Sequence, residues 1–203
     1  MTDPSRLGFI TLLDPPVELR PVAGDELQAC LGDRSCFASV AGCEIAADWP
    51  PRFFDAAAVE WMLSRRCPGH DPAWECWFVR HVGPSGRMLI GTAGFKGPPD
   101  DGGTVEIGYS IVDSYQRRGL ATLAAGMLVR WAWSTGRVGR ILAHTLADDP
   151  ASGGVLRKNG FRHVGRLTDP ADGEVDRYEQ SGPAPATSGD VHGGARRAGP
   201  KPA

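Results

Sequence analysis

Apolar and polar positions follow two different periods at the centre of the chain. From residue 104 to 112, large apolar side chains alternate with polar or small ones, and this period of two predicts a strand. From Leu120 to Trp131, apolar residues recur at intervals of three and four, which predicts an amphipathic helix. A strand, a short connection and a helix are therefore expected in this order.

The same patterns predict the elements around this centre. Three aspartates, Asp25, Asp55 and Asp149, can each cap the free amides at the start of a helix. The strand predicted directly after the central helix, at 138–145, needs a parallel crossover from the central strand. Besides the central one, strands are predicted at 17–22, 75–82, 87–96, 138–145, 161–167 and 175–179.

Length and composition predict one globular domain with two irregular ends. The chain has 203 residues, of which 41% are hydrophobic, and this is enough for a sizeable core. Residues 1–16 are expected to form an irregular arm, and residues 17–180 a single domain. Residues 181–203 are rich in Gly, Pro and Ala and poor in large apolar side chains, so we expect a disordered tail.

The sequence predicts neither a membrane span nor an export signal. No apolar run approaches the roughly 18 residues that a membrane helix needs, and the short apolar run at 7–13 lacks a cleavage site. The expected location is therefore the cytoplasm. The five cysteines lack Cys-x-x-Cys pairs and are interpreted as free thiols. A structural metal held by Cys30, Cys36 and Cys43 is the alternative.

Charge is distributed unevenly along the chain. The formal net charge of −2 argues against nucleic-acid binding. Residues 116–166 carry nine Lys or Arg against two Asp, a balance of +7, whereas residues 24–75 carry nine Asp or Glu against four Arg, a balance of −5. One region suits a polyanion and the other a cation, with two solvated surfaces as the alternative.

The connection before the central helix has the features of an anion site. The first amides of a helix lack internal partners and its dipole is positive there, so residues 116–121, Gln-Arg-Arg-Gly-Leu-Ala, suit a pyrophosphate. Gly119 leaves room for a ligand, and Arg117 and Arg118 add charge. P-loop and dinucleotide-binding fingerprints are absent. An ordinary helix start beside two surface arginines is the alternative.

Four blocks of the sequence carry a family resemblance. They are Gly-Thr-Ala-Gly-Phe-Lys-Gly-Pro-Pro at 91–99, Val-Glu-Ile-Gly-Tyr-Ser at 105–110, Tyr-Gln-Arg-Arg-Gly-Leu-Ala-Thr at 115–122, and Asp-Pro-Ala-Ser followed by Val-Leu-Arg-Lys-Asn-Gly-Phe within 149–161. In this order and spacing they resemble the Gcn5-related N-acetyltransferase (GNAT) superfamily, in its ribosomal-protein-alanine-acetyltransferase-like branch. The resemblance implies an α/β (α+β) fold. Its central mixed, mostly antiparallel sheet of six to seven strands is splayed between strands 4 and 5, here 104–112 and 138–145, and flanked by helices on both faces.

The resemblance also implies acetyl-coenzyme A as co-substrate and no metal. Its pantetheine arm would pair with the strand edge at Ile111 and Val112, with Asp149 close to the arm. Its pyrophosphate would bind at the helix start, at Gln116, Arg117, Arg118, Gly119, Leu120, Ala121 and Thr122.

Two residues are candidates for catalysis. Glu106 stands where relatives commonly carry a general base, and a structural ion pair is the alternative. Many relatives carry a tyrosine on the last helix to protonate the leaving thiol, but that position is Leu156 here. Ser152 is the nearest polar substitute, with a role in the first helical turn as its alternative. His144 can line the cleft and is left without a role.

The expected function is direct transfer of an acetyl group from acetyl-coenzyme A to a primary amine. The acceptor is a protein N-terminus or a small-molecule amine, and a larger acyl group is a variant of the same reaction. No nucleic acid or membrane partner is expected, and a homodimer is common among relatives. A non-catalytic module that binds acyl-coenzyme A as a sensor is the alternative, which the missing tyrosine motivates.

Overall fold

The computed structural model describes residues 10–12, 17–66, 69, 71–170 and 173–182. In this part of the chain a nine-stranded sheet has the order β1-β2-β4-β5-β6-β7-β9-β8, with β3 paired to β5 beside this path. The strands are β1 (Ile10–Leu12), β2 (Val17–Pro21), β3 (Glu44–Ile45), β4 (Cys76–Gly83), β5 (Gly86–Phe95), β6 (Thr104–Ile111), β7 (Arg140–Leu146), β8 (Arg162–Asp169) and β9 (Gly173–Ser181). The helices are α1 (Gly24–Cys30), α2 (Arg34–Ala41), α3 (Ala56–Ser64), α4 (Leu120–Ser134) and α5 (Pro150–Lys158), with short 3₁₀ turns η2 (Pro72–Trp74) and η3 (Asp113–Tyr115).

The expected fold class is confirmed, but the sheet has more strands than the six to seven expected. All the predicted strands are present, and among the described strands the β3–β5 and β6–β7 pairs are parallel while the others are antiparallel. The additional strands are β3 and β1, which lies inside the segment expected to be irregular. They span two and three residues, too few for a period of two to be recognised.

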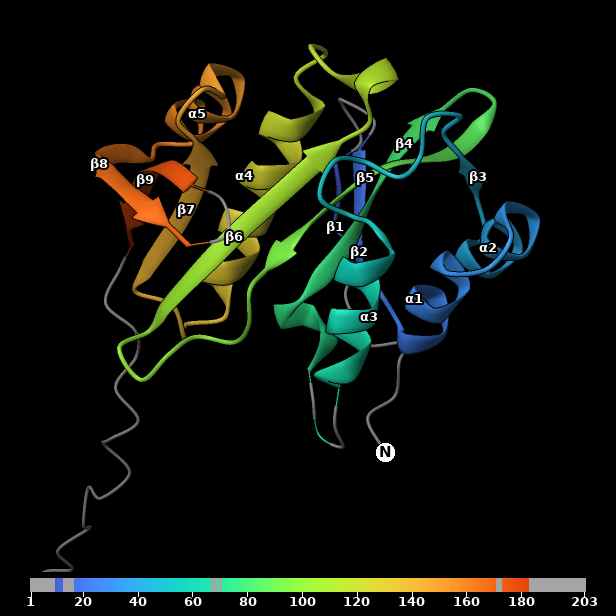
Figure 1. Cartoon of the computed structure of the whole chain (residues 1–203), viewed down its shortest axis with the longest axis horizontal. Helices are drawn as coiled ribbons and strands as arrows, with labels where there is room; N and C mark the ends of the chain where they lie inside the picture. Colours follow the sequence, from blue (N-terminus) through green and yellow to red (C-terminus); the bar gives the residue numbers. More distant parts are fainter. Residues whose placement is uncertain (1–9, 13–16, 67–68, 70, 171–172, 183–203) are drawn as a thin grey trace, which may run out of the picture.

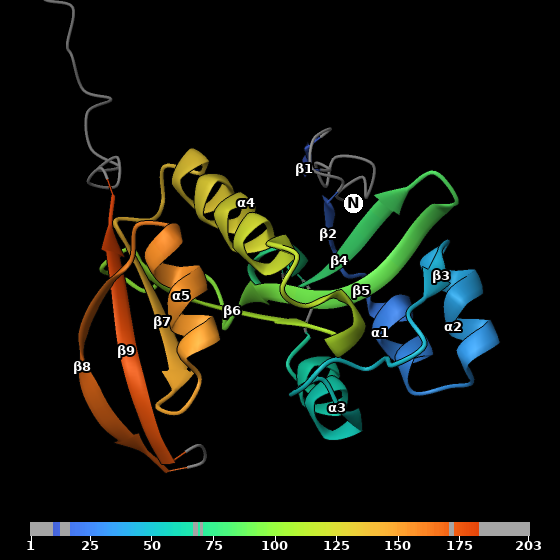
Figure 2. The ribbon, with the colours of Figure 1, turned by 90° about the horizontal axis from the view of Figure 1, so that it is seen from above.

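Helices cover both faces of the sheet. Figure 2 shows α4 and α5 on one side, called here the α4 face, and α1 and α3 on the other, called the α1 face. Trp77 and Val79 of β4 belong to the core cluster under α4, whereas Cys76 and Phe78 belong to the cluster under α1. Because successive side chains point to opposite faces and both faces are buried, this part of β4 is apolar without interruption.

β6 and β7 separate soon after they begin. They are paired in parallel through three residue pairs, of which the last joins Glu106 to Leu142. β6 then continues to Ile111 and β7 to Leu146, and Figure 1 shows the two strands diverging. The expected splay is therefore confirmed, and one edge of β6 is left open along most of its length.

α4 and α5 are joined next to this opening. Asn159, at the end of α5, donates from Nδ2 to the carbonyl oxygen of Thr122 in α4 at 3.0 Å. A Cβ on Gly126 would lie 2.6 Å from Asn159 Oδ1, so a larger residue there would displace the Asn159 side-chain amide. Since α5 packs on β7, β8 and β9, the contact holds that part of the sheet against α4.

Two of the three predicted aspartate caps are correct. The carboxylates of Asp55 and Asp149 accept hydrogen bonds from amides in the first turns of α3 and α5. The cap predicted at Asp25 is wrong, because α1 begins directly after Ala23. The Glu26 carboxylate reaches back to the Ala23 amide at 2.9 Å, as in a capping box, and this places Asp25 inside the first turn.

The predicted N-terminal arm and C-terminal tail lie largely outside the described residues. Ser181, the first residue of the predicted tail, is the last residue of β9. Residues 1–9, 13–16 and 183–203 are not described, so the arm and the tail stay predictions there. Within the described residues, no helix has the length and apolar character needed to cross a bilayer.

A substitution at Gly91 should destabilise the β5–β6 pair. A Cβ at this position would lie 2.3 Å from the Ser110 carbonyl oxygen, and a backbone atom between paired strands cannot move aside cheaply. We expect Gly91→Ala to lower the free energy of unfolding by about 1–3 kcal/mol, measured by chemical denaturation. Gly108→Ala is the control, because its Cβ would meet no atom within 4 Å. Equal stability of the two variants would contradict the prediction.

Candidate active site

The open edge of β6 presents every second backbone unit to the opening. The Val112 amide donates to Ile90 O and the Lys96 amide to Glu106 O, each at 2.9 Å. In an antiparallel pair such bonds alternate, so the odd-numbered residues from Ile107 to Ile111 direct their backbone groups away from β5. That side is open because β7 has diverged. An extended chain that carries amides could add there as a further strand.

Of the two residues whose backbone was expected to pair with a pantetheine arm, one lies on this open edge. Ile111 does, although its carbonyl oxygen accepts a hydrogen bond from Gln116 Nε2 at 2.9 Å. The Val112 amide is already bonded to Ile90 O and its carbonyl oxygen to the Tyr115 amide. The expectation for Val112 is therefore corrected: its backbone faces β5 and the following turn, because the register with β5 continues past the end of β6.

The start of α4 has a glycine cap and uncapped amides. Gly119 is the N-cap with φ 78° and makes no side-chain cap, and its carbonyl oxygen accepts from Leu123 N at 3.1 Å. The amides of Leu120, Ala121 and Thr122 are the first three of the helix, which lack intrahelical acceptors. Together with the helix dipole they have the charge and the free hydrogen-bond donors that suit an anion.

Two of the expected binding side chains build the loop before α4. Gln116 Nε2 donates to Ile111 O at 2.9 Å and to Asp113 Oδ1 at 2.8 Å, and the Arg118 guanidinium donates to Ser114 O at 2.8 Å. These contacts join the end of β6 to the segment that leads into α4. Arg117 is exposed and has φ 59°. Arg117 and Arg118 add two positive charges to the segment that directly precedes the uncapped amides.

Glu106 forms a three-residue cluster at the point where the strands separate. Its Oε1 lies 3.0 Å from His144 Nδ1 on β7 and 2.5 Å from Lys96 Nζ, just after β5. Burial raises the pKa of the Glu106 carboxyl, but the hydrogen bonds from His144 and Lys96 outweigh burial and bring the pKa below its usual value. The side chain is therefore ionised at neutral pH. The ion pair expected as an alternative to catalysis is present.

Ser152 is in contact with β6 through a tyrosine. Tyr109 donates from its hydroxyl to Ser152 O at 3.0 Å, and the same oxygen lies 3.1 Å from Ser152 Oγ. Burial raises the pKa of Tyr109 to about 12, so the phenol keeps its proton. Asp149 caps α5 by accepting from Ser152 N at 2.9 Å. Ser152 thus has the expected first-turn position, and its hydroxyl also lies beside a second protic group.

The two candidate groups lie on opposite faces of the opening. Ile107 and Tyr109 pack in or against the cluster under α4, so the alternation of β6 directs Glu106 to the α1 face. On β7, Ala143 belongs to the same cluster, so His144 lies on the α1 face with Glu106. One face of the opening therefore carries a carboxylate and an imidazole, and the other carries two hydroxyls.

Sequence reasoning left Lys96, Tyr109 and the Glu106–His144 contact unassigned. Lys96 and Glu106 are cross-strand neighbours in the β5–β6 hairpin. This contact depends on the register between the two strands, which the sequence does not give. The role of Tyr109 could have been predicted from its spacing: it lies three residues after Glu106, and on a strand this spacing places the two side chains on opposite faces. Among the described residues, no three His, Cys, Asp or Glu side chains are grouped to hold a metal ion.

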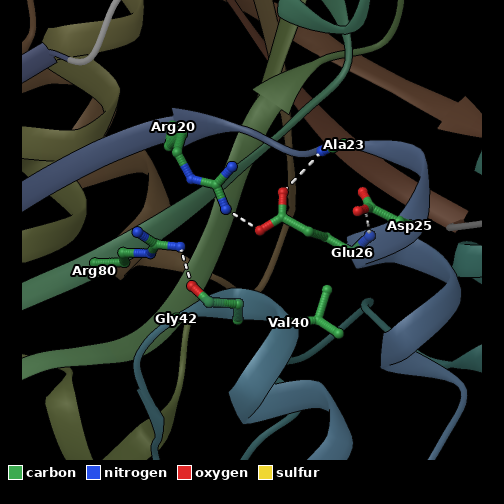
Figure 3. Close-up of a pocket in the computed structure, with 8 residues that line it drawn as sticks. Arg20, Ala23, Asp25, Glu26, Val40, Gly42 and Arg80 are labelled. Carbon is green, nitrogen blue, oxygen red and sulfur yellow. Dashed lines mark hydrogen bonds and ion pairs between the residues drawn. The ribbon is translucent and has the colours of Figure 1, made fainter. Parts of the chain in front are cut away.

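A separate cavity of about 370 Å³ lies between β2, β4, α1 and α2. Figure 3 shows its charged side chains paired with one another or with backbone: Arg20 with Glu26, and Arg80 with a carbonyl oxygen of α2, that of Ala41. Burial and the neighbouring Arg80 lower the pKa of Arg20. Because these charges already have partners, we place the candidate site at the open edge of β6.

Comparison with known proteins gives one family and a set of similar folds. A family model described as an acetyltransferase (GNAT) domain matches residues 17–162. Among curated proteins, the chain is 32% identical over 121 residues to the uncharacterized N-acetyltransferase YjdG of Bacillus subtilis, covering 59% of this chain and 70% of YjdG.

Solved structures of acetyltransferases have the same fold. RimL, a ribosomal L7/L12 alpha-N-protein acetyltransferase in complex with coenzyme A, superposes with a TM-score of 0.61 at 17% identity, covering 86% of this chain and 98% of RimL. The microcin C7 self-immunity acetyltransferase MccE, in complex with acetyl-CoA and AMP, gives 0.59 at 16% identity, covering 83% of this chain and 93% of MccE.

Gly119→Ala should weaken the binding of coenzyme A. A Cβ in the left-handed conformation costs about 1–2 kcal/mol, and relief of this strain would tilt the first amides of α4. We expect the dissociation constant from calorimetry to rise about tenfold, equivalent to about 1.4 kcal/mol. Gly136→Ala is the control: Gly136 lies just beyond α4 with φ 66°, and at both glycines a Cβ would meet no atom within 4 Å. Equal affinities of the two variants would contradict the assignment.

Proposed function

Because this chain belongs to the GNAT acetyltransferase family, we propose that it transfers an acetyl group from acetyl-coenzyme A directly to a primary amine. Family membership makes it an acetyl-coenzyme-A-dependent acyltransferase. What we propose beyond family membership is the class of acceptor and the roles of individual residues in the reaction. One observation carries it: the open edge of β6 runs between the uncapped amides at the start of α4 and the partly buried Glu106 carboxylate.

The chain's own groups fit the co-substrate. The amides of Leu120, Ala121 and Thr122, with Arg117 and Arg118 beside them, match a pyrophosphate in charge and hydrogen bonding. The edge from Ile107 to Ile111 matches the amides of pantetheine, which it would pair as an added strand. When bound there, acetyl-coenzyme A supplies the activated acetyl thioester.

The first chemical requirement is removal of a proton from the acceptor. An α-amine has a pKa of about 7.7–8.0 and a lysine about 10.4, so most of either is protonated at neutral pH. We assign this task to the Glu106 carboxylate, the general base expected from the sequence, acting directly or through a group bound to it. Its position on the α1 face implies that the acceptor enters from that face.

The other steps use the edge and the opposite face. A backbone amide of β6 would donate to the oxyanion that forms as the amine attacks the thioester. The leaving thiol would take its proton on the α4 face, where Ser152 and Tyr109 present two hydroxyls 3.1 Å apart. Separate faces for base and acid support direct transfer in a ternary complex.

The acceptor is a protein N-terminus or a small amine. The name of RimL describes an alpha-N-protein acetyltransferase, which supports the first class by likeness of fold. The balance of −5 in residues 24–75, which include α1, α2 and α3 on the α1 face, supports a cationic acceptor of either class.

A non-catalytic sensor of acyl-coenzyme A is the second candidate. Leu156, in the position where many relatives carry a tyrosine, is fully buried in the core and cannot donate a proton. Against this candidate stand the Ser152 and Tyr109 hydroxyls at the first turn of the same helix. Thiol release from acetyl-coenzyme A with a panel of peptide and small-molecule amines, followed by mass spectrometry, separates the two. A sensor would bind the co-substrate and release no thiol.

Glu106→Gln should reduce turnover and leave co-substrate binding unchanged. Loss of general-base assistance costs about 10²-fold or more in rate, whereas the dissociation constant for acetyl-coenzyme A should stay within about twofold of the wild type, less than 0.5 kcal/mol. Steady-state kinetics and calorimetry measure the two quantities.

Asp176→Asn is the matched control for this substitution. Asp176 is also a carboxylate held by a histidine and a cation, since it pairs with His163 at 3.2 Å and with Arg166 at 2.8 Å, but it lies on β9 away from the open edge. A Glu106→Gln variant with the turnover of the control would remove Glu106 from the mechanism.

A further inference from the structure

His144 stands where β7 leaves β6. Leu142 is the last β7 residue paired with β6, and His144 lies two residues further on the same α1 face. Its neighbours Ala143 and Thr145 are buried, with exposed fractions of 2% and 6%, whereas the His144 side chain is 23% exposed. The imidazole is therefore at the mouth of the opening and partly accessible from the face that carries Glu106.

The contact with Glu106 orients the two nitrogens of the ring. Nδ1 lies 3.0 Å from Glu106 Oε1, and an ionised carboxylate can only accept a hydrogen bond. The hydrogen of the neutral ring is therefore on Nδ1, which leaves a lone pair on Nε2. Among the described residues, no hydrogen bond or ion pair involves Nε2.

We propose that Nε2 of His144 accepts the proton from the acceptor amine, and that Glu106 is a positioning residue that holds the ring and stabilises the imidazolium ion. This inference rests on the proposed acetyl transfer. The arrangement has the logic of a carboxylate–histidine pair in hydrolases, where the carboxylate fixes the tautomer and is not itself protonated.

Glu106 is less suited than an imidazole to take the proton itself. The Oε1 atom already accepts from Lys96 and His144, and these hydrogen bonds more than offset burial, so the carboxyl pKa is lowered. A general base works best when its pKa is close to the operating pH. Imidazole groups as a class titrate in that range.

The proton and electron balance closes without another reactant. The ammonium group gives one proton to Nε2, which frees the nitrogen lone pair for attack on the acetyl carbonyl carbon. As the carbon–nitrogen bond forms and the carbon–sulfur bond breaks, the electron pair of the latter leaves with sulfur. The thiolate becomes a thiol by taking a proton through the Ser152 and Tyr109 hydroxyls on the α4 face, the second proton lost by nitrogen replaces it, and the imidazolium proton passes to solvent.

The other charged groups around the ring come from three elements. Lys96, after β5, binds the same Glu106 oxygen. On β9, Arg177 is the register partner of His144, and it is paired with Glu179 at 2.7 Å. Arg162 of β8 is the register partner of Glu179. Unlike these groups, the Glu106 carboxylate is in hydrogen-bond contact with the ring. Its negative charge therefore offsets the positive charges nearby.

The test is the pH dependence of kcat/KM in four proteins. The wild type should lose activity at acid pH, because the base must be unprotonated. His144→Gln should lower kcat/KM about 10²-fold or more and lose this acid limb. Glu106→Gln should keep the limb but displace it to lower pH, since the imidazolium ion loses its carboxylate. His163→Gln, which removes the other carboxylate-bound histidine of β7, β8 and β9, should match the wild type.

Three results would overturn the proposal. If His144→Gln keeps the acid limb and Glu106→Gln loses it, the carboxylate accepts the proton itself. If His144→Gln has wild-type kcat/KM and profile, the ring has a structural role. Both results overturn this inference alone, because acetyl transfer still occurs. If the wild type binds acetyl-coenzyme A by calorimetry but releases no thiol with any amine, the proposed function fails and this inference with it.

Discussion

The site depends on a constraint of backbone hydrogen bonding. Amides and carbonyls of a strand need partners, and leaving a buried one without any costs about 1–3 kcal/mol. β7 meets this need only as far as Glu106, so the following part of β6 requires water or a ligand with the hydrogen-bonding pattern of a peptide. Recognition by the main chain puts little demand on the side chains of the edge, which explains why ordinary apolar residues occupy it.

The pleat of the same strand separates two chemistries. Glu106 and Tyr109 are three residues apart on one strand, so the Glu106 side chain points to the α1 face and the Tyr109 side chain to the α4 face. On opposite faces each keeps its own partners, His144 for the one and Ser152 for the other. A ligand held on the edge would meet both.

Predictions from the sequence are accurate where the deciding interaction is local and fail where it is not. Caps at Asp55 and Asp149 and the period of β6 follow from residues adjacent in the chain, whereas Asp25 fails because Glu26 reaches back to a competing amide. The direction of the Val112 amide depends on its register with β5. The contact between Glu106 and His144 needs the pairing of β6 with β7, which no local pattern contains. The resemblance to a family supplied the splay, and residue patterns alone did not.

The contact between α4 and α5 limits how far the two parts of the sheet can move relative to each other. Three residue pairs connect β6 to the β7–β9–β8 half of the sheet, and such a short connection would act as a hinge if nothing else held the halves. The hydrogen bond from Asn159 to Thr122, formed where Gly126 has no side chain, links the two parts of the sheet a second time. A larger residue at 126 would displace the Asn159 amide and so disturb its hydrogen bond to Thr122, which means that a position in the middle of α4 controls how the two parts of the sheet are joined.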